Sequence, residues 1–166
     1  MPEPTPPPPP PKPFVRPWMK RRPGQFIGKG HPAGDFLEAY DWQVLEERSG
    51  LLRILAHIPE HVRNPRGQLF GGFTPTYVDL VALFTIRTAE ERDATGFRTW
   101  LATSNMRVDY FEPIVGPTFL IESTLLKQRS RTNFVETRFF DPEDTLAVYA
   151  LTTIRTLQLN RPLGDG

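Results

Sequence analysis

One apolar segment near the middle of the chain limits the folds that are open to it. Between positions 66 and 87 the only charged residue is Asp79. The segment starts at the glycine pair Gly71-Gly72 and continues as an apolar run that predicts a helix from about Phe73 to Arg92. A helix that is apolar on all sides belongs in a protein interior, so the rest of the chain is expected to fold around it.

The glycine pair and the isolated acid together indicate a catalytic site. Glycine allows close backbone approach to a ligand, and the free N–H groups at a helix start bind anions or polarised oxygens. A carboxylate such as Asp79 in an apolar helix needs a partner that holds it there. Two structural explanations stay open: the helix dipole could favour Asp79, and the glycines could only allow close packing.

The other segments predict an α+β fold in which one antiparallel sheet wraps around the long helix. In residues 51–59, apolar Leu52, Ile54 and Ala56 alternate with Arg53 and His57, the pattern of a half-buried strand. A Gly-rich linker is expected at 25–31 and a short helix at 32–40. Strands are expected at 42–49, 51–59, 98–111, 117–128, 132–140 and 146–159, the first two as a hairpin and the last four as a meander. One helix covers little of a sheet, so we expect a dimer.

The first 24 residues differ in composition from the rest and predict a basic, disordered arm. Eleven of the nineteen prolines lie there, six of them consecutively from Pro6 to Pro11. Such a run favours polyproline II and cannot form helix or sheet. The arm could be a solvated tail or a ligand for an aromatic groove or an acidic surface. The chain is therefore divided into the arm, 1–24, and one globular domain, 25–166.

Charge and composition exclude several classes of function. Lys and Arg number 20 and Asp and Glu 19, so the net charge of +1 gives no reason to expect binding to nucleic acid. Cysteine is absent and the three histidines show no metal-type spacing, so neither a thiolate nor a metal site is expected. No apolar run is long enough for a membrane span and no signal peptide is evident, which predicts a cytoplasmic protein.

The order of motifs resembles that of the hotdog-fold acyl-CoA thioesterases, in particular the phenylacetyl-CoA thioesterase-like group. That pattern, N-x-x-G-x-x-H-G-G followed by L/V-x-D in a buried helix, stands here as NPRGQLFGG at 64–72 and YVD at 77–79. A strand that ends in Y-x-x-P follows the helix in the family, and Tyr110 to Pro113 fits it. The resemblance extends from about Trp42 to Leu157 and implies the hotdog fold for the whole globular part.

The resemblance also implies a role for each matched residue. Asp79 would be the catalytic carboxylate, acting as a nucleophile or as a general base for water. The backbone N–H of Gly71 would stabilise the oxyanion, and Asn64 would position substrate or water. Thr103 falls where related enzymes carry a Ser or Thr that orients the water. In that group the site lies between two subunits, so a homodimer or a dimer of dimers is implied, with Asn64 and Gly71 of one subunit facing Asp79 and Thr103 of the other.

Six further residues are expected to contact the substrate, an acyl-CoA, and no cofactor is implied beyond the coenzyme A of the substrate itself. Aromatic residues bracket the glycines, and arginines could clamp the coenzyme A phosphates. A solvated hairpin tip is the simpler interpretation of the basic cluster around position 129. The expected substrate-binding residues are Phe70, Gly72, Phe73, Arg66, Arg129 and Arg131.

One departure from the family pattern keeps a second function open. Many members have a histidine where this chain has Phe70. A phenyl ring cannot hydrogen-bond near the thioester, so a protein that binds acyl-CoA without hydrolysis, or a scaffold on the same fold, is the alternative. A hydratase or dehydratase of the same fold would use a histidine paired with an acid at a different place, and the absence of a histidine near Asp79 in the motif argues against that function. An interaction module built on the proline-rich arm is the remaining possibility.

Overall fold

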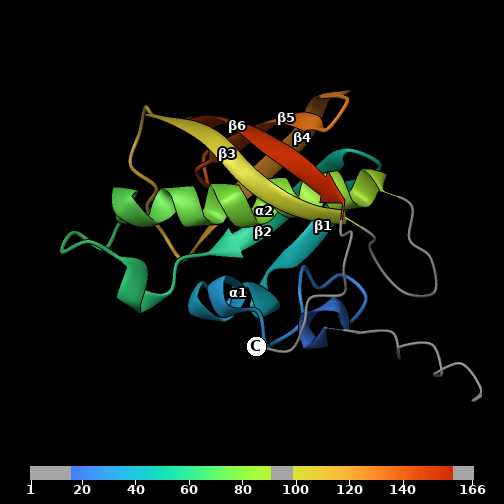
Figure 1. Cartoon of the computed structure of the whole chain (residues 1–166). Helices are drawn as coiled ribbons and strands as arrows, with labels where there is room; N and C mark the ends of the chain where they lie inside the picture. The colour runs from blue at the N-terminus through green and yellow to red at the C-terminus, as the bar shows by residue number, and fades with distance from the viewer. Residues whose placement is uncertain (1–15, 91–98, 159–166) are drawn as a thin grey trace, which may run out of the picture.

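The computed structural model describes residues 16–90 and 99–158, and in them a single antiparallel sheet wraps around one long helix (Figure 1). This confirms the expected α+β architecture. The helix, α2, spans Thr74–Ala89. The strands are β1 (Gln43–Arg48), β2 (Leu51–His57), β3 (Thr99–Tyr110), β4 (Thr118–Arg129), β5 (Thr132–Phe140) and β6 (Leu146–Gln158).

The order of strands across the sheet differs from the expected four-strand meander in one respect. The order is β1-β2-β4-β5-β6-β3, so β3 pairs with β6 and not with β4, which follows it in sequence. Among the described strands β3 therefore has a neighbour on one side only, and it crosses in front of α2 in Figure 1. Alternation along a strand reports which face is buried but not which strand lies alongside, so this placement could not be predicted.

Strand β2 shows why the sheet buries one face. Leu52, Ile54 and Ala56 are buried, whereas Arg53 and His57 between them are half-buried, as the alternation predicted. The buried residues pack with α2 and with residues of the neighbouring β4, such as Phe119 and Ile121, in one core. Alternate burial along the strands thus makes one face of the sheet apolar, and the long helix packs against that face.

The outer face of the sheet, away from α2, carries a row of ion pairs. Arg53 on β2 lies 3.9 Å from Glu46 on β1 and 3.2 Å from Glu122 on β4. Arg138 on β5 continues the row, since it pairs with Glu122 and lies 3.6 Å from Glu136. Charged side chains of alternating sign suit this face to water, so the uncovered sheet face itself gives no argument for a dimer.

Helix α2 is less deeply buried than its apolar sequence predicted. Tyr77, Val78 and Val81 are fully buried, but Thr76, Asp79 and Leu83 are only half-buried. The half-buried positions recur at intervals of three and four, so they form a stripe along one face of the helix. We call Thr76, Asp79 and Leu83 the open stripe of α2.

The segment before β1 is packed against the domain. Phe26 and Ile27, expected in a linker, are completely buried, and the N–H of Gly28 donates to the carbonyl of Trp18 at 2.8 Å. Residues 16–24, which the sequence assigned to the arm, include a 3₁₀ turn at Pro17–Met19. Residues 1–15 of the expected arm lie outside the described residues.

The expected helix at 32–40 is shorter and broken. Helix α1 covers Pro32–Phe36, and a separate 3₁₀ turn covers Ala39–Asp41. Glu38 between them adopts a left-handed conformation with φ of 54°, which interrupts helical hydrogen bonding. A left-handed glutamate is uncommon, so propensity alone favours continuation of the helix through this position.

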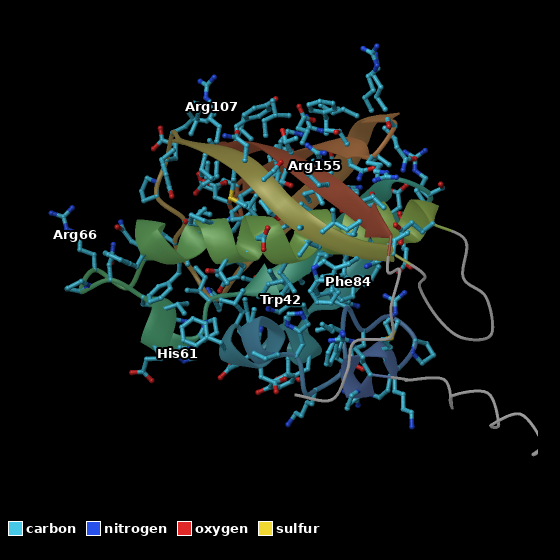
Figure 2. All side chains as sticks on the ribbon, in the orientation of Figure 1. Trp42, His61, Arg66, Phe84, Arg107 and Arg155 are labelled. Atoms are coloured by element: carbon cyan, nitrogen blue, oxygen red, sulfur yellow. The ribbon has the colours of Figure 1, made fainter. Side chains whose placement is uncertain are left out.

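A column of aromatic rings joins this N-terminal segment to the core. The ring of Trp42 stacks on Phe26 at 5.5 Å and on Tyr77 of α2 at 5.1 Å. Phe26 also contacts Phe84 of α2, with ring centroids 5.0 Å apart. Figure 2 shows Trp42 and Phe84 between α2 and the N-terminal segment. The segment therefore covers a flank of the helix that the sheet leaves open.

Candidate active site

The glycine turn lies at the entrance to α2, as the sequence predicted. A 3₁₀ turn, Gly71–Phe73, leads directly into the helix. Among the described residues, neither the N–H of Gly71 nor that of Gly72 has a hydrogen-bond acceptor, whereas the N–H of Phe73 donates to the carbonyl of Phe70 at 2.9 Å. The first N–H groups of a helix have no partner within the helix, so these two are available to a ligand oxygen.

Asn64 uses its side chain to close the loop before the glycines. Its Oδ1 accepts from the N–H of Arg66 at 2.9 Å and from that of Gln68 at 3.1 Å. Its Nδ2 donates to Oε1 of Gln68 at 3.1 Å. Gly67, with φ of 75°, allows the tight turn between them. In this conformation the Asn64 amide holds the loop that carries the glycines.

Asp79 and Thr103 are joined by a hydrogen bond. The hydroxyl of Thr103 on β3 donates to Oδ1 of Asp79 on the open stripe of α2. Asp79 is half-buried and Thr103 is exposed, so the carboxylate has a partner and also faces outward. The partner that an acid in an apolar helix requires is thus a strand hydroxyl, brought alongside by β3.

Gly71 and Asp79 of one chain stand too far apart to act on the same bond. Eight residues separate them, and a helical rise of 1.5 Å per residue sets them about 12 Å apart along the axis. A carbonyl oxygen on the Gly71 N–H and an attacking atom at the carbonyl carbon each need contacts of about 3 Å. A single chain therefore places the two candidate groups apart, one at the start of α2 and one in its middle, and we call each of them a candidate half-site.

Aromatic rings lie beside the glycine turn, as expected for Phe70 and Phe73. The centroids of these two rings are 5.7 Å apart. The ring of Phe36 lies 5.5 Å from that of Phe73 and 4.9 Å from that of His61. Phe36 is 43% exposed and Phe70 51%. The sequence missed Phe36, because its spacing with Leu37 suggested a core-facing position. Helix α1 instead buries Leu37 and turns Phe36 toward Phe73.

Tyr110, which sequence reasoning matched to a family motif without a role, contacts the glycine turn directly. Its hydroxyl donates to the carbonyl oxygen of Gly71 at 2.8 Å. Tyr110 and Gly71 line a cavity of about 280 Å³ together with Leu69, Thr74, Phe111, Glu112, Pro113, Ile114 and Val148. The end of β3 thus forms one wall beside the candidate oxyanion donor.

The expected phosphate-binding arginines do not gather in one chain. Arg66 lies on the loop before α2, whereas Arg129 and Arg131 lie at the exposed tip of the β4–β5 hairpin. Figures 1 and 2 show that loop and this hairpin at opposite ends of the molecule.

Comparison with known families decides the class of protein. The family model described as the thioesterase superfamily matches residues 66–148, which contain the glycine turn, α2, β3, β4 and β5. The chain belongs to the thioesterase superfamily. The name of that superfamily states its general reaction, the hydrolysis of thioesters. No curated protein sequence matches this thioesterase-family chain.

Solved thioesterase structures share the fold, which confirms the hotdog architecture. A thioesterase from Haemophilus influenzae aligns with a TM-score of 0.67 at 11% identity, covering 79% of this chain and 86% of its own. A hypothetical thioesterase from Streptococcus pneumoniae, solved with coenzyme A, aligns with a TM-score of 0.62 at 13% identity, covering 73% of this chain and 89% of its own. Zebrafish thioesterase superfamily member 2 aligns with a TM-score of 0.62 at 24% identity, covering 76% of this chain and 88% of its own.

Across residues 16–90 and 99–158 there is no group of three or more His, Asp or Glu side chains arranged to hold a metal ion. In the same part of the chain, no helix combines the length and the apolar character needed to cross a bilayer.

Proposed function

We propose that this thioesterase-family protein hydrolyses acyl-CoA. The observation that carries the proposal is the Thr103–Asp79 hydrogen bond on the open stripe of α2. It keeps a carboxylate oriented at a half-exposed position in an otherwise apolar helix. The free N–H groups at the start of the same helix supply what a carboxylate cannot, a binding place for developing negative charge.

In the proposed reaction the thioester carbonyl oxygen accepts a hydrogen bond from the Gly71 N–H. Asp79 either takes a proton from water, which attacks the carbonyl carbon, or attacks that carbon itself and forms an anhydride that water then cleaves. The carbon–sulfur bond breaks when the tetrahedral intermediate collapses. The thiolate leaves and is protonated, and the products are a carboxylic acid and the free thiol of coenzyme A.

We propose that two copies of the chain complete each site. The half-site at Gly71 of one copy would face Asp79 and Thr103 of the other, because about 12 Å of helix separates the two half-sites within one chain. Strand β3 has one free edge among the described strands, and the open stripe lies beneath it. Pairing along that edge would form a homodimer, or a dimer of dimers, with two equivalent sites.

The substrate assignment draws on charge and aromatic surface. Arg129 and Arg131 would meet the coenzyme A phosphates from one subunit, and Arg66 would do so from the other. The acyl group would pack against Phe70 and Phe73 beside the oxyanion donor. The coenzyme A in the S. pneumoniae thioesterase structure supports a coenzyme A thioester as substrate. The proposed chemistry needs no further cofactor.

Binding of acyl-CoA without hydrolysis is the second candidate. Phe70, which lies beside both glycines and has no hydrogen-bonding group, is the observation that favours it. In that case the site would hold the thioester while lacking the polar contact that a histidine makes there in related enzymes.

The deciding experiment measures thiol release from short, long and aryl acyl-CoA substrates by the purified protein and by Asp79→Asn. The chain contains no cysteine, so a thiol reagent reports coenzyme A alone. We expect hydrolysis of at least one substrate and a fall in kcat of about two orders of magnitude or more in the variant. If neither protein hydrolyses any thioester while both bind acyl-CoA, the binding function replaces the hydrolase.

A further inference from the structure

We infer that Tyr110 is a positioning residue for the oxyanion donor, acting through the carbonyl of Gly71. This inference rests on the proposed function and extends it to a residue outside the expected catalytic set. The Tyr110 hydroxyl donates to Gly71 O at 2.8 Å, and Cε1 of its ring lies 3.5 Å from where a β-carbon of Gly71 would stand. The hydroxyl thus restrains the Gly71 carbonyl, while the ring lies beside the space that a β-carbon of Gly71 would occupy.

Gly71 needs such a contact because its own backbone is only partly fixed. Glycine has the widest range of backbone angles, and Gly71 is the first residue of the 3₁₀ turn. Its carbonyl accepts from the N–H of Thr74, which closes that turn, and from Tyr110 as a second donor. Two donors on this carbonyl restrain the peptide plane that it shares with the Gly72 N–H. The neighbouring plane, which carries the Gly71 N–H, contains the Phe70 carbonyl, and that carbonyl accepts from the Phe73 N–H at 2.9 Å. The Tyr110 contact thus limits rotation about the Gly71 α-carbon, between the two planes that carry the free N–H groups.

The strand that carries Tyr110 also carries Thr103. Strand β3 therefore contacts both half-sites of its chain: Thr103 near its start orients Asp79, and Tyr110 at its end orients Gly71. Strand β3 pairs with β6 from Thr99↔Gln158 to Tyr110↔Val148, with one irregularity between Thr103 and Asn105, so Thr103 and Tyr110 both lie on a strand that is hydrogen-bonded to the sheet. A group placed on a rigid strand holds a reacting geometry more tightly than one placed on a loop.

Stability alone does not account for the Tyr110 contact. The side chain is 52% exposed and lies at the last residue of the strand, so its burial contributes little to the core. Removal of the hydroxyl alone leaves the ring contact with Gly71 in place. The variant Tyr110→Phe therefore separates orientation of the turn from stability of the fold.

The test compares Tyr110→Phe with Tyr149→Phe, a matched control. Tyr149 lies on the adjacent strand β6, and its hydroxyl bonds Glu136 on the outer face of the sheet. For Tyr110→Phe we expect kcat for acyl-CoA to fall about tenfold with KM within about twofold and the melting temperature unchanged. We expect amide hydrogen exchange at Thr74, whose N–H donates to the Gly71 carbonyl, to rise about fivefold in the same variant. Tyr149→Phe should change neither kcat nor amide hydrogen exchange.

Three results would overturn the inference. The first is a Tyr110→Phe protein with wild-type kcat and exchange; the second is a loss of kcat that only Tyr110→Leu shows, because the ring would then be responsible. The third is a wild-type protein that hydrolyses no acyl-CoA, which removes the proposed function and with it any catalytic role for Tyr110. Hydrogen exchange in the same samples still shows whether the hydroxyl fixes the turn, so the two failures are distinguishable.

Discussion

The ring of Phe70 lies over the α-carbon of Gly72, so that a β-carbon at position 72 would stand 2.7 Å from Cε1 of Phe70. Because Phe70 is half-exposed, its ring can swing aside when a methyl group is added. We expect Gly72→Ala to lower the free energy of unfolding by no more than about 1 kcal/mol, yet to raise KM for acyl-CoA because the ring is displaced from the substrate.

A double variant checks that the displaced ring is the cause. Adding Gly72→Ala to Phe70→Ala should change KM no further, since the two substitutions act through one contact. Steady-state kinetics of the wild type, both single variants and the double variant give the coupling. Additive effects would show that Gly72 acts on the substrate independently of Phe70.

The hydroxyl of Thr103 should matter to turnover more than to folding. Thr103→Val removes the donor to Asp79 while keeping a β-branched side chain suited to a strand, so we expect kcat to fall about tenfold or more. Thr103→Ser keeps the donor and should retain most of the activity. Equal rates for the serine and valine variants would remove the hydroxyl from the mechanism.

The arginines at the β4–β5 tip should contribute to binding of coenzyme A and not to bond cleavage. Replacing both Arg129 and Arg131 by Glu should raise KM for acyl-CoA about tenfold or more, with little change in kcat. The same variant should treat an acyl thioester of N-acetylcysteamine, which lacks phosphates, as the wild type does. Arg22→Glu, at an exposed position of the N-terminal segment, is the control.

His31 should make stability depend on pH in the weakly acidic range. Burial lowers the pKa of His31 and neighbouring Arg16 acts in the same direction, whereas Asp35 opposes them. The neutral ring is the form that accepts from the N–H of Gly34 at 3.1 Å and caps α1. The unfolded chain therefore binds the proton more readily than the folded one, and the free energy of unfolding falls as pH drops below the ordinary value of about 6.5.

The variant His31→Asn isolates this effect. Asparagine is a good N-cap and has no titrating group, so the variant keeps the cap of α1 and removes the protonation equilibrium at position 31. Urea unfolding at several values of pH between about 5 and 8 should show a smaller pH dependence for the variant than for the wild type. An identical dependence would assign it to other groups.

Local patterns predicted the elements but not all of their neighbours. Alternation in residues 51–58 gave the buried face of β2 correctly, and the apolar run after Gly72 gave α2. The crossing of β3 to the far edge of the sheet and the left-handed Glu38 depend on tertiary packing, which no local window contains. The half-exposed stripe of α2 escaped prediction for a related reason, since an apolar helix can face a partner as well as a core.

The candidate site was predictable to the extent that it follows sequence order. Gly71 and Asp79 lie on one helix, and their spacing alone sets them about 12 Å apart. The family resemblance already placed Thr103 with Asp79, 24 positions away, whereas the contact of Tyr110 with Gly71, 39 positions away, required the fold. Asn64 was expected at the substrate, and its hydrogen bonds to the next turn show how a polar residue can serve a site by shaping the backbone.

The aromatic column Phe26–Trp42–Tyr77 has a consequence for any shortened form of the protein. The family model matches residues 66–148, but Tyr77 inside that stretch packs against rings that lie before it in sequence. A fragment cut to the boundaries of the family match would lose β1, β2 and the rings of Phe26 and Trp42. It would expose an apolar flank of α2 to water, and such a surface favours aggregation. The smallest part of this chain that folds on its own is therefore larger than the stretch that the family model matches.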